Sequence, residues 1–204
     1  ALPRQIIQEI IVVDNGSTDE TARVAIDNGA RVVKEPKKGY GAACLKGIEG
    51  LDAPDIVVFL DGDFSDFPEE IVSLIEPIEK EDKDFVIGSR MILPQSRAAL
   101  LPQARYGNQL AVFLIKLFFN HTYTDLGPFR AIRYNSLMSI GMQDTNFGWT
   151  VEMQIKAIKK GLRILEVPVK YRERVGVSKI TGTVSGTFKA GIKIIYTIFK
   201  YLLI

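Results

Sequence analysis

The chain has 204 residues, of which 47% are hydrophobic and 25% are charged, so we expect one globular domain with a sizeable core. The net charge of +2 gives no general attraction to nucleic acid, and we expect no nucleic-acid partner. A single cysteine, Cys44, excludes an internal disulfide and a cysteine zinc cluster, and it suits a reducing compartment. The sequence has no run of 18 apolar residues, so it offers no candidate for a membrane-spanning helix.

The first 34 residues predict a β-α-β unit. An apolar run over residues 10–13 predicts a buried strand that ends at Asp14. Residues 17–20 can cap a helix that runs to about Asn28, with acidic residues in its first turn where the helix dipole favours them. Residues 31–34 predict a second strand, and this order of elements predicts a parallel sheet.

A glycine-containing turn follows and opens the next predicted helix. Gly39 and Gly41 stand just after two lysines, Lys37 and Lys38. Free backbone N–H groups at such a helix start can cradle a phosphate. A plain glycine connection with no ligand is the alternative interpretation.

Two carboxylates follow the most apolar strand of the chain. Residues 56–60 predict a short buried strand, and Asp61-Gly62-Asp63 comes directly after it. The mouth of a parallel sheet is where such folds bind ligands. Carboxylates at this place suit a hard divalent cation that also holds phosphate oxygens. An ordinary solvated turn is the alternative.

The middle of the chain is less regular. A strand over residues 84–90 ends on Arg90, and residues 91–105 predict a long mobile loop of the kind that covers an active site. Residues 106–119 predict a strongly apolar helix that lies in the core or faces a membrane. A helix over 147–160 and an edge strand over 163–169, where Pro168 is tolerated, complete this region.

The last residues predict an amphipathic helix. Lys189, Lys193 and Lys200 fall on one face of an otherwise apolar helix over residues 186–204. This pattern suits a bilayer surface. Packing on the core or in a homodimer is the alternative.

Several motifs in order resemble one enzyme family. Segments 13–19 (VDNGSTD), 39–42 (GYGA), 61–63 (DGD) and 88–90 (GSR) resemble the inverting family 2 glycosyltransferases of GT-A fold. Within that family, the chain is most similar to the polyprenol-phosphate sugar transferases of the dolichyl-phosphate mannose synthase type. The resemblance implies an α/β fold with a mostly parallel, Rossmann-like sheet flanked by helices and followed by a C-terminal amphipathic helix.

The resemblance also shows departures from the family. Asn15 and Gly62 stand where the family usually has aspartate and alanine. The family has a first strand that holds the nucleotide, and this strand is missing before Ile10. We therefore expect a glycosyltransferase domain over residues 1–184 without its first strand, and a membrane-surface or dimerising helix over residues 185–204.

The resemblance assigns roles to matching residues. Segments 124–130 and 171–179 resemble two further family motifs. The residues implied to contact a nucleoside-diphosphate sugar are Asp14, Asn15, Ser17, Gly39, Gly41, Asp61, Arg174 and Lys179. Asp61 and Asp63 would bind Mg²⁺ or Mn²⁺. Arg90 and Arg105 would hold an acceptor phosphate, and Asp125 and Arg130 are the catalytic candidates, with Asp125 as base or orienting carboxylate.

The predicted reaction moves a sugar from a nucleoside-diphosphate sugar to an acceptor, for which the resemblance favours polyprenyl phosphate. A saccharide acceptor of a cell wall or polysaccharide, and a non-catalytic membrane-surface scaffold, are the alternatives. A nucleotidyltransferase would have a glycine-rich loop after its first strand, and no such loop follows residues 10–13. We expect the protein in the cytoplasm, peripheral at the cytoplasmic face of a membrane.

Overall fold

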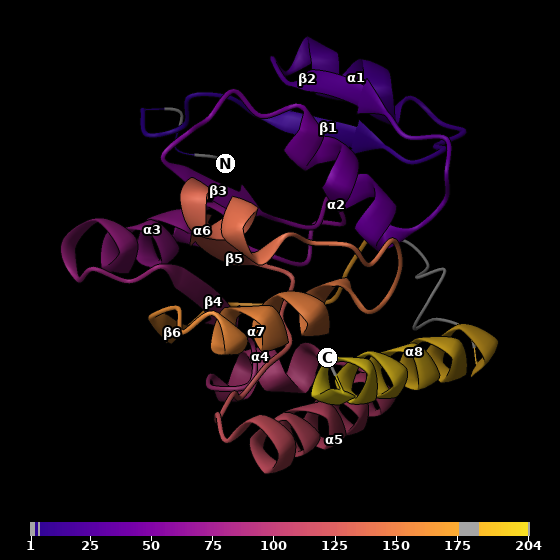
Figure 1. Ribbon diagram of the computed structural model, residues 1–204. Coiled ribbons are helices and arrows are strands. Elements are labelled where there is room, and N and C mark those ends of the chain that lie inside the picture. Colours follow the sequence, from indigo (N-terminus) through magenta and orange to yellow (C-terminus); the bar gives the residue numbers. More distant parts are fainter. Residues whose placement is uncertain (1–2, 4, 176–183, 204) are drawn as a thin grey trace.

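Hydrogen bonds divide the strands into two sheets. The computed structural model describes residue 3, residues 5–175 and residues 184–203 (Figure 1). The smaller sheet pairs β1 (Ile11–Asp14) with β2 (Arg31–Lys34). The larger sheet has the order β3 (Ile56–Phe59), β5 (Arg130–Arg133), β4 (Phe85–Ser89) and β6 (Ile164–Pro168).

The predicted β-α-β unit is confirmed in the smaller sheet. Strands β1 and β2 run parallel in the register Ile11 to Arg31, and α1 (Thr21–Asp27) connects them. Helix α2 (Tyr40–Glu49) then lies against β1 (Figure 1). This unit brings Asp14 and the start of α2 to the same end of the small sheet.

The larger sheet is mixed, because β5 runs antiparallel to both β3 and β4. Strands β4 and β6 are parallel, and β6 lies at the edge of the sheet, where its proline is tolerated as predicted. Strand β5 and the following α6 (Tyr134–Ile140) are not among the elements expected from the sequence. The run Arg-Ala-Ile-Arg gives little strand signal, since charged residues occupy both of its ends.

The core lies on both faces of the larger sheet. On one face α3 (Ile71–Lys80), which follows a short 3₁₀ helix η1 (Pro68–Glu70), packs Leu74 and Ile78 against Val86. On the other face, α5 (Pro102–Phe119) and α7 (Trp149–Lys159) cover Phe85 and Ile87. Alternate residues of each strand therefore point to opposite helix layers.

The expectation of a long mobile loop over residues 91–105 is wrong. Helix α4 (Pro94–Ala99) and the start of α5 occupy this stretch. Ser96 is buried, and its hydroxyl donates a hydrogen bond to the carbonyl of Val169 at 2.9 Å. Both prolines stand at the first position of a helix, where the missing N–H costs nothing, so they begin helices here.

The C-terminal helix α8 (Val184–Leu203) lies beside α5 and α7 (Figure 1). The rings of Phe118 and Phe199 are 5.3 Å apart, and the hydroxyl of Tyr201 donates to the buried carboxylate of Glu152 at 2.7 Å. One side of α8 is thus attached to the core. Within the described ranges, no helix combines the length and the apolar content that crossing a bilayer requires.

Candidate active site

The turn after β3, residues 61–66, carries three aspartates and is called the acidic turn below. Asp63 accepts hydrogen bonds from the backbone N–H of Ser65 at 3.0 Å and from its hydroxyl at 2.5 Å. Burial and the neighbouring charge of Asp63 raise the pKa of Asp61, which the side chain of Tyr40 partly offsets by a hydrogen bond. The fold therefore keeps two carboxylates close together although their charges repel each other.

Asp66 is the residue of this turn that sequence reasoning missed. Its side chain is only 2% exposed, and neither carboxylate oxygen has a hydrogen-bond partner among the described residues. Burial, followed by the charge of Asp61, raises the pKa of Asp66 from 3.8 to about 7. The signal in the sequence is a third aspartate within six residues.

A later segment of the chain lies alongside the acidic turn. Tyr171 forms an antiparallel bridge with Asp66, and the backbone N–H of Val175 donates to the carbonyl of Asp63 at 3.0 Å. The guanidinium of Arg174 comes within 3.4 Å of the Asp63 carboxylate. The structure therefore brings the predicted Arg174 to the predicted metal ligand. Lys179, its predicted companion, lies outside the described residues.

Arg90 and Asp125 form a buried bidentate pair. The guanidinium of Arg90 donates from Nε and Nη2 to the two carboxylate oxygens of Asp125, each at 2.8 Å. The backbone N–H of Arg90 donates to the same carboxylate at 2.8 Å. The Arg90 guanidinium also lies 5.1 Å from the ring centre of Tyr171, so this pair adjoins the segment that borders the acidic turn. Both oxygens of Asp125 are engaged, which suits orienting Arg90 rather than accepting a proton.

Arg130 and Arg105 do not join this cluster. Arg130 is fully buried and donates to the backbone carbonyls of Gly127 and Thr150 at 3.0 and 3.1 Å. Its guanidinium holds the Gly-Pro turn, and burial lowers its pKa. Arg105 lies half-buried on α5, and no contact in the described part of the chain links it to the acidic turn.

The predicted nucleotide residues at the end of β1 form a separate hydrogen-bonded turn. Asp14 accepts from the backbone N–H of Ser17 at 2.8 Å, and this bond lowers the pKa of Asp14. The carboxamide of Asn15 donates to the carbonyls of Glu35 and Lys37, each at 2.8 Å. Asn15 thus connects the end of β1 to the loop before α2.

Gly39 and Gly41, at the start of α2, pack against the backbone of residues 144–145. The N–H of Gly39 already donates to the side chain of Asn15 at 2.9 Å, and the N–H of Ala42 donates to the carbonyl of Thr145 at 2.9 Å. A Cβ on Gly39 or Gly41 would collide with the backbone of residues 144–145. These glycines allow a close approach of two segments, and their predicted contact with a nucleotide sugar stays a prediction.

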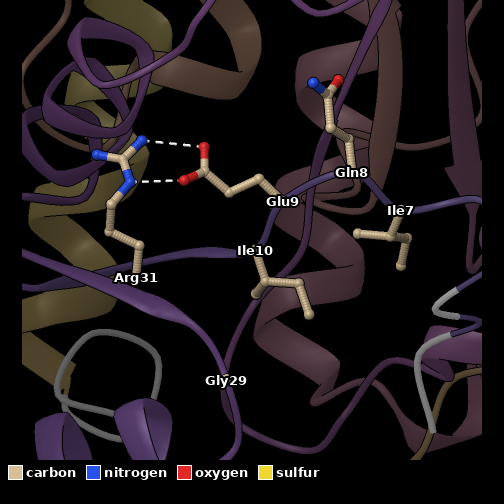
Figure 2. A pocket seen from close by; sticks show the side chains of 6 residues that line it. All are labelled: Ile7, Gln8, Glu9, Ile10, Gly29 and Arg31. Carbon is tan, nitrogen blue, oxygen red and sulfur yellow. Dashed lines mark hydrogen bonds and ion pairs between the residues drawn. The ribbon is translucent and has the colours of Figure 1, made fainter.

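A hollow away from the acidic turn lies beside the start of β1 (Figure 2). Arg31 and Glu9 face each other there, with Nε–Oε1 and Nη2–Oε2 distances of 2.6 and 2.9 Å. Arg31 also donates to the carbonyl of Gly50 at 2.6 Å. The charges of this pair are satisfied by each other, and we assign no site to this hollow.

The acidic turn has a donor set that fits a hard divalent cation. Asp61 and Asp63 offer carboxylate oxygens, which suit Mg²⁺ or Mn²⁺. The carboxyl group of Asp66, in the same turn, has no hydrogen-bond partner among the described residues. Within the residues that the structure describes, no three His, Cys, Asp or Glu side chains are placed to hold a metal together. A bound ion would therefore need further ligands from a substrate, such as diphosphate oxygens.

The structure combines a mixed sheet between helix layers, carboxylates directly after β3, and Arg174 of a later segment close to one of them. The comparisons with known proteins identify the family. The family model described as "Glycosyl transferase family 2" matches residues 5–141, and the chain belongs to this family.

Relatives of known sequence include an uncharacterized glycosyltransferase of Mycobacterium tuberculosis, 33% identical over 181 residues, which covers 88% of this chain and 81% of the relative. A dolichyl-phosphate hexose transferase of Haloferax volcanii is 33% identical, covering 84% of this chain and 73% of the relative. An undecaprenyl-phosphate mannosyltransferase of Micrococcus luteus is also 33% identical, covering 87% and 78%.

Among solved structures, the glucosyl-3-phosphoglycerate synthase of Mycobacterium tuberculosis superposes with a TM-score of 0.78 at 22% identity. The match covers 98% of this chain and 70% of the synthase, which was crystallised with Mn²⁺, UDP-glucose and phosphoglyceric acid. This likeness shows the GT-A fold.

Proposed function

We propose that this glycosyltransferase moves a sugar from a nucleoside-diphosphate sugar to a polyprenyl phosphate. The observation that carries the proposal is the approach of Arg174 to Asp63 at 3.4 Å, beside the buried Arg90–Asp125 pair. This arrangement offers carboxylates for a metal and two guanidinium groups for phosphates. Two relatives named above act on dolichyl phosphate and undecaprenyl phosphate by their names, which supports this acceptor class.

In this proposal the acidic turn binds the donor diphosphate. Asp61 and Asp63 would hold a divalent ion, which would supply positive charge where the departing diphosphate gains negative charge. Arg174 lies close enough to Asp63 to reach the same group, and we assign Lys179 to it from its motif alone. Asp14, Asn15 and Ser17 remain candidates for contacts to the nucleoside.

Arg90 is our candidate for the acceptor phosphate. The second pKa of a phosphate monoester is about 6, so the acceptor is mostly ionised at neutral pH and needs orientation more than a strong base. Asp125 fixes the Arg90 guanidinium through two hydrogen bonds and is therefore a positioning residue. We leave Arg105 and Arg130 out of the reacting groups, because the first shows no contact to the site among the described residues and the second is fully buried.

We also propose that α5 and α8 form a face that rests on an anionic membrane surface, called the two-helix face below. Both helices expose large apolar side chains at helical spacing: Tyr106, Leu110, Phe113 and Leu117 on α5, and Phe188, Ile192, Tyr196 and Leu203 on α8. Lys116 and Lys189 are exposed on the same two helices. Apolar side chains with flanking lysines suit an interfacial helix pair.

The membrane proposal is tested by sedimentation with vesicles. We expect the protein to sediment with vesicles that contain anionic lipid, and Phe113→Ser with Tyr196→Ser to weaken this binding. The exposed Val24 on α1 provides the control variant Val24→Ser. Unchanged sedimentation of the double variant would contradict the membrane proposal, and a concentration-dependent dimer lost in that variant would assign the face to a second copy.

The reaction is tested directly. The protein is incubated with Mg²⁺ or Mn²⁺, a polyprenyl phosphate, and UDP-glucose, UDP-GlcNAc or GDP-mannose in turn, and lipid-linked sugar is measured. We expect product with one donor, and none from Asp63→Ala. The exposed Asp52 outside the site gives the matched control Asp52→Ala.

The solved neighbour suggests the competing acceptor for the same assay. That synthase was crystallised with phosphoglyceric acid, which also carries a phosphate. Transfer to phosphoglyceric acid and not to the lipid would replace the acceptor in our proposal. Transfer to neither, with no nucleotide binding, would refute it.

A further inference from the structure

A hollow of about 440 Å³ opens beside the acidic turn, and its lining is mostly apolar. The lining residues are Gly62, Asp63, Phe64 and Val175. Phe64 and Val175 are 61% and 69% exposed, although both are large and apolar. Among the lining residues that the structure describes, Asp63 is the charged one, and the guanidinium of Arg174 lies 3.4 Å from its carboxylate. The hollow therefore has an apolar wall and one charged end.

Phe64 is held in this exposed position by an unfavourable backbone and a specific partner. Its φ of 68° lies in the left-handed region, which costs a non-glycine residue about 1 kcal/mol or more. The guanidinium of Arg172 lies 3.4 Å from the ring centre, and its Nε donates to the Phe64 carbonyl at 2.5 Å. One face of the ring is therefore covered by Arg172. Neither the strain nor the exposure stabilises the free protein, which points to a ligand.

We propose that Phe64 and Val175 bind the first isoprene units of the acceptor lipid, whose phosphate extends toward the guanidinium groups of Arg90 and Arg174. This inference rests on the proposed function and names a binding wall for its acceptor. A sugar ring would need polar partners for its hydroxyls, and among the described lining residues Asp63 alone has a polar side chain. A hydrocarbon joined to a phosphate matches the apolar wall together with the positively charged Arg174 beside Asp63.

Arg172 has a separate role that the test must distinguish. Its backbone N–H donates to the carbonyl of Ser65 at 3.0 Å, and its side chain lies over both Phe64 and Phe67. It thereby holds the segment that brings Arg174 to Asp63. A substitution of Phe64 could act through this contact rather than through lost apolar surface, so phosphate binding without a lipid tail must be measured too.

Binding is measured by titration calorimetry in the presence of Mn²⁺ and UDP, with farnesyl phosphate and inorganic phosphate as probes. We expect Phe64→Ser and Val175→Ser each to weaken farnesyl phosphate binding about tenfold, since each removes apolar contact area worth roughly one factor of ten. Inorganic phosphate and UDP should bind as in the unaltered protein. Phe64→Leu, which keeps apolar surface, should recover most of the affinity, and Val24→Ser should change nothing.

Three outcomes would overturn the inference. The first is equal weakening of both probes, which would mean that Phe64 acts through Arg172, as Arg172→Gln would also show. The second is weaker binding of a UDP-sugar with unchanged farnesyl phosphate, which would assign the hollow to the donor sugar. The third is no farnesyl phosphate binding by the unaltered protein. Binding without sugar transfer would leave the inference intact while refuting the proposed reaction, so the two failures are distinguishable.

Discussion

The carboxyl group of Asp66 makes a sharp test of how the acidic turn is built. It is buried without a hydrogen-bond partner among the described residues, and its pKa is raised from 3.8 to about 7. In Asp66→Asn a neutral amide replaces this carboxyl at nearly equal volume. We expect the substitution to change how the free energy of unfolding depends on pH, more than its value at any one pH.

The sign follows from proton binding. Between about pH 4 and pH 7 the folded protein holds a proton on Asp66 that the unfolded chain has lost, so the unaltered protein loses stability as pH rises through this window. Since the pKa rises from 3.8 to about 7 and each pKa unit corresponds to about 1.4 kcal/mol, this loss in the free energy of unfolding is at most about 4 kcal/mol. The buried amide costs about 1–3 kcal/mol of its own, but this cost does not depend on pH.

The assay is urea unfolding at pH 4.5 and pH 8 in EDTA, which keeps divalent ions from the carboxylates. From pH 4.5 to pH 8, we expect the free energy of unfolding of Asp66→Asn to rise by about 2–4 kcal/mol relative to that of the unaltered protein. The exposed Asp52→Asn is the control and should follow the unaltered protein. Parallel pH profiles for Asp66→Asn and the unaltered protein would refute the argument that an ionised carboxylate is penalised at this position.

Three further predictions concern packing and hydrogen bonds, and urea unfolding at pH 7 checks each. Gly41→Ala should lower the free energy of unfolding by about 1–3 kcal/mol, because the new Cβ collides with the backbone carbonyl of Asp144. An unchanged urea midpoint would show that the two backbone segments can move apart without a cost in stability. Tyr201→Phe should cost about 1–2 kcal/mol through the lost hydrogen bond to Glu152, and no loss would mean that this bond does not help to attach α8. Asp125→Asn should cost about 3–5 kcal/mol by leaving Arg90 without its carboxylate, and a smaller effect on unfolding than on sugar transfer would show that the pair serves catalysis more than stability.

The first half of the fold was largely predictable, because its signals are local. Apolar runs that are followed by Asp14 and Asp61, with a helix and a glycine stop between the first two strands, follow rules of short range. The N-cap residue of α1, Glu20, makes no side-chain cap hydrogen bond, and the acidic first turn predicted for that helix is absent from α1. The strand β5 could not be predicted in the same way. Arg130 points into the core and satisfies its donors on backbone carbonyls, an arrangement that depends on tertiary contacts.

The site was predictable in its members more than in their arrangement. The motif order named Asp63, Arg90, Asp125 and Arg174, and the structure places them around one turn. The pairing of Arg90 with Asp125 joins residues 35 positions apart, and no local pattern reports such a contact. The burial of Asp66 likewise depends on the segment at Tyr171, which arrives more than 100 residues later.

The position of β5 between β3 and β4 has a consequence for how the chain folds. Among the described strands, β3 pairs with β5, and β4 pairs with both β5 and β6. Residues 56–59 therefore pair with residues more than 70 positions further along the chain. Such long-range pairing is slow, because a large loop must close, at a cost in chain entropy, before the strands make stabilising contacts. During synthesis, the small sheet of β1 and β2 can assemble early, while the strand that carries the acidic turn stays unpaired until most of the chain has left the ribosome.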